Sequence, residues 1–93
     1  MSTIAEIQKA TSYHFQVPIS EILSKDRHKY IVTARQVAVY LSRELTNHSF
    51  NVIGRQFKRD KSTVISSFNR IVHLGGKNSV IANDIREIIG RIK

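Results

Sequence analysis

The chain has 93 residues, which is enough for one small domain with a modest core and too few for an enclosed active site beside that core. Its 15 Lys and Arg outnumber its 7 Asp and Glu and leave a formal charge of +8. A domain this basic favours a polyanion as its partner, because contacts with phosphates release condensed counterions. The sequence contains no cysteine, so disulfides, thiolate metal sites and cysteine nucleophiles are excluded.

The composition otherwise suits a soluble protein, with 41% hydrophobic and 24% charged residues. No apolar run approaches the roughly 18 residues that a membrane span needs. The N-terminal residues include an acid and no basic cluster, so we do not expect a signal peptide. We therefore expect a cytoplasmic protein that does not bind a membrane.

The first predicted helix begins at a capping box. Thr3 and Glu6 have the spacing of this motif, in which each side chain bonds a backbone N–H group of the other residue. Apolar residues then recur at helical spacing to about Gln16, and Pro18 ends the helix. Ser20 is expected to cap a short helical turn that follows.

The longest predicted helix covers residues 30–46, after a polar and basic link. Its apolar residues recur every three or four positions and form one stripe, as in a helix that packs on a core. The stripe consists of Ile31, Ala34, Ala38, Leu41 and Leu45.

Three more helices are predicted in the second half of the chain. Ser49 is placed to cap a helix over residues 50–57, and Asp60 is placed to cap a helix that ends before the Gly pair at residues 75–76. The last helix is predicted over residues 80–92. No segment shows the alternation of a strand, so the sequence predicts an all-α fold, a compact bundle of five to six helices.

The pair of helices within residues 50–74 has the features of a helix-turn-helix. A small residue, Gly54, stands where two crossing helices would approach, and the capped start of the second helix would enter a major groove. The turn position that usually takes Gly is Lys58, which predicts a strained or altered turn. An ordinary helical corner without a DNA role is the alternative. The apolar residues expected to fill the angle are Ile53, Phe57 and Val64.

Several motifs together resemble one family. They are Ile-Leu-Ser-Lys-Asp-Arg at 22–27, Ala-Arg-Gln-Val-Ala at 34–38, Arg-Glu-Leu-Thr-Asn-His-Ser at 43–49, Ile-Gly at 53–54, Phe57, Arg-Asp-Lys-Ser-Thr-Val at 59–64 and Asp-Ile at 84–85. This pattern resembles the C-terminal DNA-binding domain of the bacterial replication initiator DnaA. The resemblance implies that residues 1–93 form a single DnaA-type helix-turn-helix domain that binds double-stranded DNA as a monomer.

Three differences from that family bear on function. Lys61 stands where the family usually has His, and the turn between Phe57 and Arg59 lacks a residue that the family commonly carries. The chain also has no Gly-rich phosphate-binding loop of an ATPase module. We therefore expect either an excised domain of an initiator or a small stand-alone relative.

The resemblance and the residue chemistry together predict the site. The helix over residues 60–74 is expected in the major groove and Arg27 in the adjacent minor groove, where narrow AT-rich DNA concentrates negative potential. The alternative for Arg27 is a solvated loop charge without a DNA contact, and the alternative for Asp60 is a helix cap that reads no base. The predicted base-reading residues are Arg27, Asp60, Lys61, Ser62 and Ser66. The predicted phosphate contacts are Lys25, Arg35, Gln36, Arg43, His48, Arg59, Thr63 and Arg70.

Catalysis, metal binding and cofactor binding are not expected, nor is a small-molecule substrate. His14, His28, His48 and His73 have no partner at ligand spacing on one face. The aromatic residues Tyr13, Phe15, Tyr30 and Tyr40 are expected in the core.

Three functions remain open from the sequence. The first is sequence-specific binding of double-stranded DNA at replication-origin boxes, which would place the protein at the nucleoid. The second is a stand-alone DNA-binding regulator with a different site. The third is a protein-interaction module without a DNA role, in which the long or the final helix docks a partner.

Overall fold

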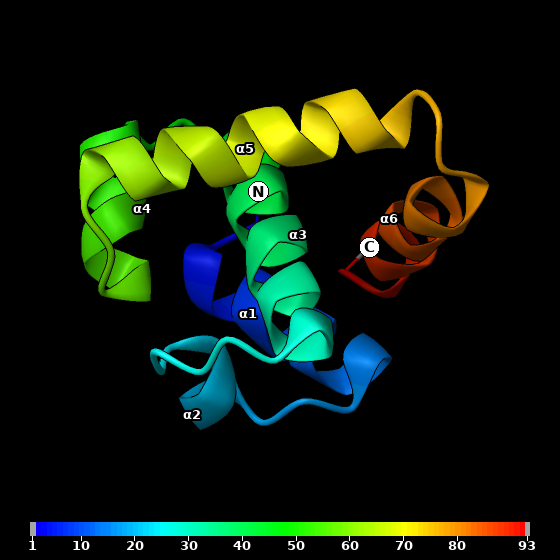
Figure 1. The fold of residues 1–93 in the computed structure, drawn as a ribbon, viewed down its shortest axis with the longest axis horizontal. Coiled ribbons are helices and arrows are strands. Elements are labelled where there is room, and N and C mark those ends of the chain that lie inside the picture. The colour runs from blue at the N-terminus through cyan, green and yellow to red at the C-terminus, as the bar shows by residue number, and fades with distance from the viewer. Residues whose placement is uncertain (1, 93) are drawn as a thin grey trace.

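Six helices make up the fold in a computed structural model that describes residues 2–92 (Figure 1). They are α1 (Ile4–Phe15), α2 (Ile19–Ile22), α3 (Lys29–Leu45), α4 (Phe50–Phe57), α5 (Lys61–Gly75) and α6 (Ser79–Ile92). Helix α3 runs through the centre and packs against α1, α2, α4 and α5, while α6 packs on α1 and α5. The described residues contain no strand, so the predicted all-α bundle is confirmed.

Side-chain caps fix the starts of α1 and α4. The Thr3–Glu6 capping box is present, with Glu6 N donating to Thr3 Oγ1 at 3.1 Å and Thr3 N donating to Glu6 Oε1 at 2.9 Å. Ser49 Oγ accepts from Val52 N at the start of α4, as predicted. The prediction for Ser20 is wrong: α2 begins at Ile19, directly after Pro18, and has no side-chain cap.

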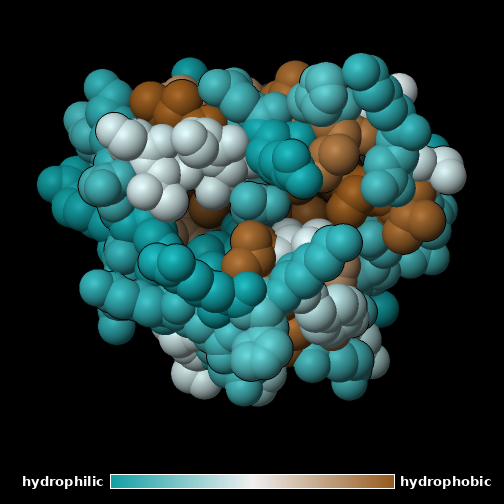
Figure 2. Space-filling view, in the orientation of Figure 1, coloured by the Kyte–Doolittle hydropathy of each residue, from teal (hydrophilic) through white to brown (hydrophobic). Residues whose placement is uncertain are grey.

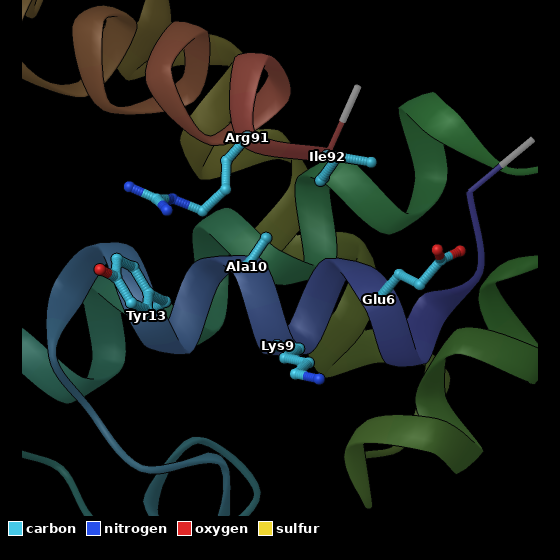
Figure 3. A pocket seen from close by; sticks show the side chains of 6 residues that line it. All are labelled: Glu6, Lys9, Ala10, Tyr13, Arg91 and Ile92. Carbon is cyan, nitrogen blue, oxygen red and sulfur yellow. The ribbon is translucent and has the colours of Figure 1, made fainter.

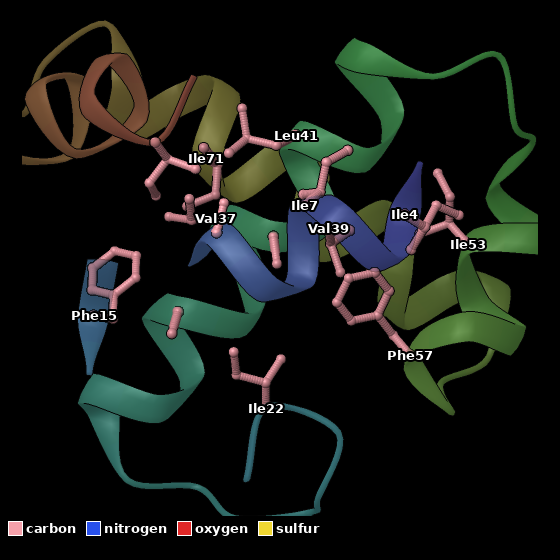
Figure 4. Packing of buried hydrophobic residues seen from close by; sticks show 14 of the residues in the cluster. Ile4, Ile7, Phe15, Ile22, Val37, Val39, Leu41, Ile53, Phe57 and Ile71 are labelled. Carbon is pink, nitrogen blue, oxygen red and sulfur yellow. The ribbon is translucent and has the colours of Figure 1, made fainter. Parts of the chain in front are cut away.

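The core is formed where α3 meets its neighbours. Leu41, Ile53 and Phe57 have no exposed surface, and Figure 4 shows Ile53 and Phe57 directed from α4 into the cluster of α1 and α3. Two residues of the predicted stripe, Ile31 and Leu45, are only partly buried at its edges. Burial of these side chains is the main stabilisation that the fold has.

Two of the four aromatic residues expected in the core lie on the surface. Tyr13 is 59% exposed and Tyr30 is 56% exposed, so that prediction is wrong for both, whereas Phe15 is buried. Each tyrosine still has a partner. The Tyr30 hydroxyl donates to the carbonyl of Phe15, and the guanidinium of Arg91 lies 4.0 Å from the centre of the Tyr13 ring.

Helix α6 is tied to α1 by a polar contact that the sequence did not predict. His14 Nε2 lies 2.8 Å from Asp84 Oδ1, and His14 Nδ1 lies 3.7 Å from Glu87 Oε2. The expectation that the histidines have no partner at ligand spacing is therefore wrong for His14. One ligand atom each from His14, Asp84 and Glu87 lies within 4.8 Å of the other two. This arrangement is that of an interhelical hydrogen bond.

Tyr13 and Arg91 also line a shallow hollow of about 330 Å³ between α1 and the end of α6 (Figure 3). Glu6, Lys9, Ala10 and Ile92 complete its lining. Within residues 2–92, no helix combines the length and the apolar character that crossing a bilayer requires.

Candidate nucleic-acid interface

The turn between α4 and α5 brings the two helices into close contact at Gly54. Arg59 N donates to Gly54 O at 2.8 Å, and Lys58 N donates to Arg55 O at 3.3 Å. A Cβ atom on Gly54 would lie 2.6 Å from Arg59 O, closer than real Cβ contacts come. The chain can therefore make this turn only without a side chain at residue 54, as the sequence predicted.

Lys58 forms the turn in the left-handed conformation. Its φ is 57° and its ψ is 42°, values that usually belong to Gly. The strain predicted from the sequence is thus present, and it lies at an exposed lysine. The single left-handed residue ends α4, and three residues, 58–60, lead from α4 into α5.

Asp60 caps α5. Its Oδ1 accepts from Thr63 N at 2.8 Å, and this backbone hydrogen bond lowers the pKa of the carboxyl group below its usual value of 3.8. The carboxylate is therefore ionised at neutral pH and lies at the positive end of the helix dipole. The bond to Thr63 uses one of its two oxygens, so capping and accepting a further hydrogen bond are compatible.

The first turns of α5 expose polar side chains on one side of the helix. Val64, Ser67 and Ile71 are buried against the bundle. The predicted contact residues on α5, all exposed, are Lys61, Ser62, Thr63, Ser66 and Arg70. The structure therefore presents a polar, partly cationic surface that starts at the capped end of α5.

A loop between α2 and α3 carries a second cationic group. Lys25 and Arg27 are exposed there. Asp26 between them folds the loop: His28 N and His28 Nδ1 lie 2.8 and 2.6 Å from Asp26 Oδ1. The hydrogen bonds from His28 lower the pKa of Asp26, and the same side-chain bond to Asp26 raises the pKa of His28 above its usual 6.5.

Arg35 does not lie on the surface, so the prediction that it contacts a phosphate is wrong. Its side chain is buried, with 7% of the residue exposed. Nε donates to Ile22 O at 2.6 Å, and Nη2 lies within hydrogen-bond distance of three further carbonyl oxygens at the end of α2 and in the loop. The sequence placed Arg35 correctly on the side of α3 away from the apolar stripe, but α2 and the loop cover that side.

The other predicted phosphate contacts lie at three places. Arg43 and His48 are exposed where α3 leads into α4, and Arg43 Nη1 donates to His48 O at 3.0 Å. Gln36 is half-buried on α3. Arg59 is half-buried in the turn, where its guanidinium donates to main-chain carbonyls.

Hydrophilic side chains cover most of the face shown in Figure 2, and hydrophobic atoms gather mainly near α6 and at the corner formed by α4.

One feature of the site has no signal in the sequence. The carbonyl oxygen of Ser24 accepts from both Arg35 and Arg59. A backbone carbonyl exists at every position, so no residue type could have indicated it.

Comparison with known proteins gives a consistent result along most of the chain. The family model described as bacterial dnaA protein helix-turn-helix matches residues 4–71. The chromosomal replication initiator protein DnaA of Gluconobacter oxydans is 36% identical over 91 residues, which cover 97% of this chain and 19% of that protein. The initiators of Streptococcus equi subsp. zooepidemicus and Caulobacter vibrioides are 38% and 34% identical and match 97% and 98% of this chain. The chain spans about a fifth of the length of these relatives.

Proposed function

This chain belongs to the bacterial DnaA helix-turn-helix family, and from that membership we propose that it binds double-stranded DNA in a sequence-specific way, at boxes of a replication origin. Helix α5 enters the major groove, and Arg27 enters the adjacent minor groove. The observation that carries this proposal is the capped start of α5. It is braced against α4 at Gly54 and exposes Lys61 and Ser62.

Each base-reading residue has a chemistry suited to a base edge. The ionised carboxylate of Asp60 accepts from the amino group of a cytosine, and Lys61 donates to O6 or N7 of a guanine. Ser62 bonds either kind of base, while Ser66, one turn further along α5, meets a thymine methyl group or a phosphate. The guanidinium of Arg27 is attracted to a narrow, AT-rich minor groove.

The other cationic and polar groups position the domain on the DNA backbone. Contacts with phosphates orient a protein on the duplex without reading its sequence. Lys25, Gln36, Arg43, His48, Thr63 and Arg70 take this part. Arg59 lies in the turn that precedes α5, between the base-reading residues and the residues that contact the DNA backbone. The net charge of +8 supports a large electrostatic share of the affinity. The domain acts as a monomer at the nucleoid, without a small-molecule substrate.

A second target is favoured by two features beside the start of α5. Lys61 replaces the His that is usual in the family, and the turn before Asp60 has a single left-handed residue, Lys58. Both changes adjoin the base-reading end of α5. A chain with these residues at the start of α5 can act as a regulator that recognises a different DNA sequence from that of the usual origin box.

Selection of bound duplexes from a random library tests both proposals. We expect one enriched motif, and a match to repeats in the origin of the source bacterium supports the first proposal. A motif absent from that origin supports the regulator. Recovery of no motif, together with an affinity that does not change with salt, would overturn DNA binding, because each neutralised phosphate contributes about 0.9 to the log–log salt slope.

A matched pair of variants separates base reading from backbone contact. Lys61→Ala removes a charge at the start of α5 and is expected to change which motif is enriched. Arg43→Ala removes the same charge away from α5 and is expected to weaken all duplexes alike. Equal losses on every sequence in both variants would contradict the role assigned to Lys61.

A further inference from the structure

Two arginines from distant parts of the chain meet at one carbonyl oxygen. Ser24 O, at the start of the loop before α3, accepts from Nη2 of Arg35 at 2.9 Å and from Nη2 of Arg59. Arg35 belongs to α3, and Arg59 belongs to the turn that precedes α5. The loop that carries Arg27 and the turn that starts the recognition helix are thus joined at a single atom.

Arg35 fixes the rest of this loop. Besides Ser24 O, its guanidinium donates to Ile22 O at 2.6 Å, to Glu21 O at 3.2 Å and to Asp26 O at 3.1 Å. The carbonyls at the end of a helix lack hydrogen-bond partners within that helix. The guanidinium of Arg35 provides such partners at the end of α2 and also bonds carbonyls of the following loop. A planar guanidinium can bond several carbonyls at fixed angles, whereas a lysine ammonium is a compact charge on a flexible stem.

Arg59 makes the corresponding contacts on the side of the turn. Its Nη1 lies 3.3 Å from Phe57 O and 3.2 Å from Lys58 O, while Nη2 reaches Ser24 O. The next residue, Asp60, caps α5. A shift of the loop would therefore break the contact between Ser24 and Arg59, the residue directly before the cap of the recognition helix.

The two guanidinium groups that meet at Ser24 O repel each other electrostatically. Burial lowers the pKa of Arg35 below its usual value, and the nearby charge of Arg59 lowers it further. Asp26 opposes this effect with its negative charge. A guanidinium with 7% of its residue exposed contributes little to long-range attraction of DNA compared with an exposed one, so its value lies in the carbonyls that it holds.

We propose that Arg35 and Arg59 are positioning residues. They hold the Arg27 loop at a fixed place relative to the first turn of α5, and they thereby determine selectivity at the base pairs that Arg27 reads. This inference rests on the proposed DNA binding. A loop ordered in advance does not lose conformational entropy on binding, and it places Arg27 in one register along the groove.

The test uses Arg35→Lys, which keeps the net charge and removes most of the carbonyl contacts. Arg86→Lys is the control, because Arg86 is an exposed residue of α6, away from the loop and from α5. In the free proteins, limited trypsin digestion should cleave after Lys25 and Arg27 at least tenfold faster in Arg35→Lys than in wild type. Arg86→Lys should behave as wild type. Equal cleavage rates in all three proteins would overturn the positioning role.

The second measurement uses the duplex enriched by wild type and its single base-pair variants. Arg27→Ala first identifies the base pairs that Arg27 reads. Arg35→Lys should reduce discrimination at the same base pairs to within about threefold, leave discrimination at the α5 contacts and the salt slope unchanged, and add no further loss in the double variant with Arg27→Ala. A uniform loss on all duplexes, or unchanged discrimination, would overturn the proposal.

Arg59→Lys gives an independent readout if Arg35→Lys is too unstable to study. It leaves the four contacts of Arg35 in place and removes the link between the turn and Ser24, so the same base pairs should lose discrimination. Failure of wild type to select any duplex would overturn the proposed function. Faster loop cleavage in Arg35→Lys would still show that Arg35 holds the loop, so the two failures are distinguishable.

Discussion

Replacing Gly54 by Ala tests the close approach on which the helix-turn-helix depends. The added Cβ would lie 2.6 Å from Arg59 O, 3.6 Å from Arg59 C and 3.5 Å from Val64 Cγ2. The nearest atom belongs to the backbone, so relief requires the turn itself to move. We expect this movement to lengthen the 2.8 Å hydrogen bond from Arg59 N to Gly54 O.

Three effects set the size of the change. Overpacking of a buried site costs about 1–3 kcal/mol. Alanine gains about 1 kcal/mol over glycine in a helix interior, and loss of one hydrogen bond costs about as much. The last two nearly cancel, so Gly54→Ala should lower the free energy of unfolding by about 1–3 kcal/mol. For a domain of this size, each kcal/mol lowers Tm by about 4–8 °C.

Gly90 provides the control within the same protein. It is an exposed residue of α6, and a Cβ there would meet nothing within 4 Å. Gly90→Ala should therefore gain up to about 1 kcal/mol from helix propensity alone. Thermal and urea unfolding of both variants checks the argument. A Gly54→Ala protein as stable as wild type would refute the claim that the turn excludes a side chain.

Three other predictions concern the charged residues of the interface. Asp60→Asn keeps a good helix cap but removes the carboxylate, so it should melt within about 1 kcal/mol of wild type and lose preference at one base pair; unchanged preference would reduce Asp60 to a cap. Lys58→Gly should relieve the strain of the left-handed conformation and stabilise the fold by up to about 1 kcal/mol. If Lys58 contacts a phosphate in the complex, the same variant should also lower the log–log salt slope by about 0.9. Because the pKa of His28 is raised from 6.5 and that of Asp26 is lowered from 3.8, their contact should be complete between about those two values and weaken as pH rises through the pKa of His28. DNA affinity should therefore fall between pH 6 and pH 8 by more in wild type than in His28→Gln, and equal falls would contradict this.

The features that the sequence predicted well are those that depend on neighbouring residues. Thr3 with Glu6, Ser49 with Val52, and Asp60 with Thr63 are each three residues apart. At that distance the helix itself fixes the geometry, so residue type and spacing suffice. Gly54 was predicted for a similar reason, because the turn that brings Arg59 against it begins only four residues later.

The features that the sequence missed depend on which elements cover which face. Tyr13 and Tyr30 were expected in the core because aromatic residues usually are, but each is held at the surface, by Arg91 and by the carbonyl of Phe15. The wrong start of α2 has a different cause. Pro18 fixes its own φ and suits the position directly before a helix, so α2 begins after it without a side-chain cap. Helix α1 has already ended at Gln16, which takes the left-handed conformation.

Arg35 shows why residue type alone gives an ambiguous prediction at a basic interface. On α3 it differs little in sequence from Arg43, since both lie outside the apolar stripe and both occur in motifs shared with the family. One is buried among carbonyls and the other is exposed beside His48. The difference arises because α2 and its loop fold back over the N-terminal half of α3 and leave the C-terminal half open. A charge count of +8 therefore overstates the number of cations that reach DNA. The salt slope, which counts only neutralised phosphates, should fall below the value that the sequence alone suggests.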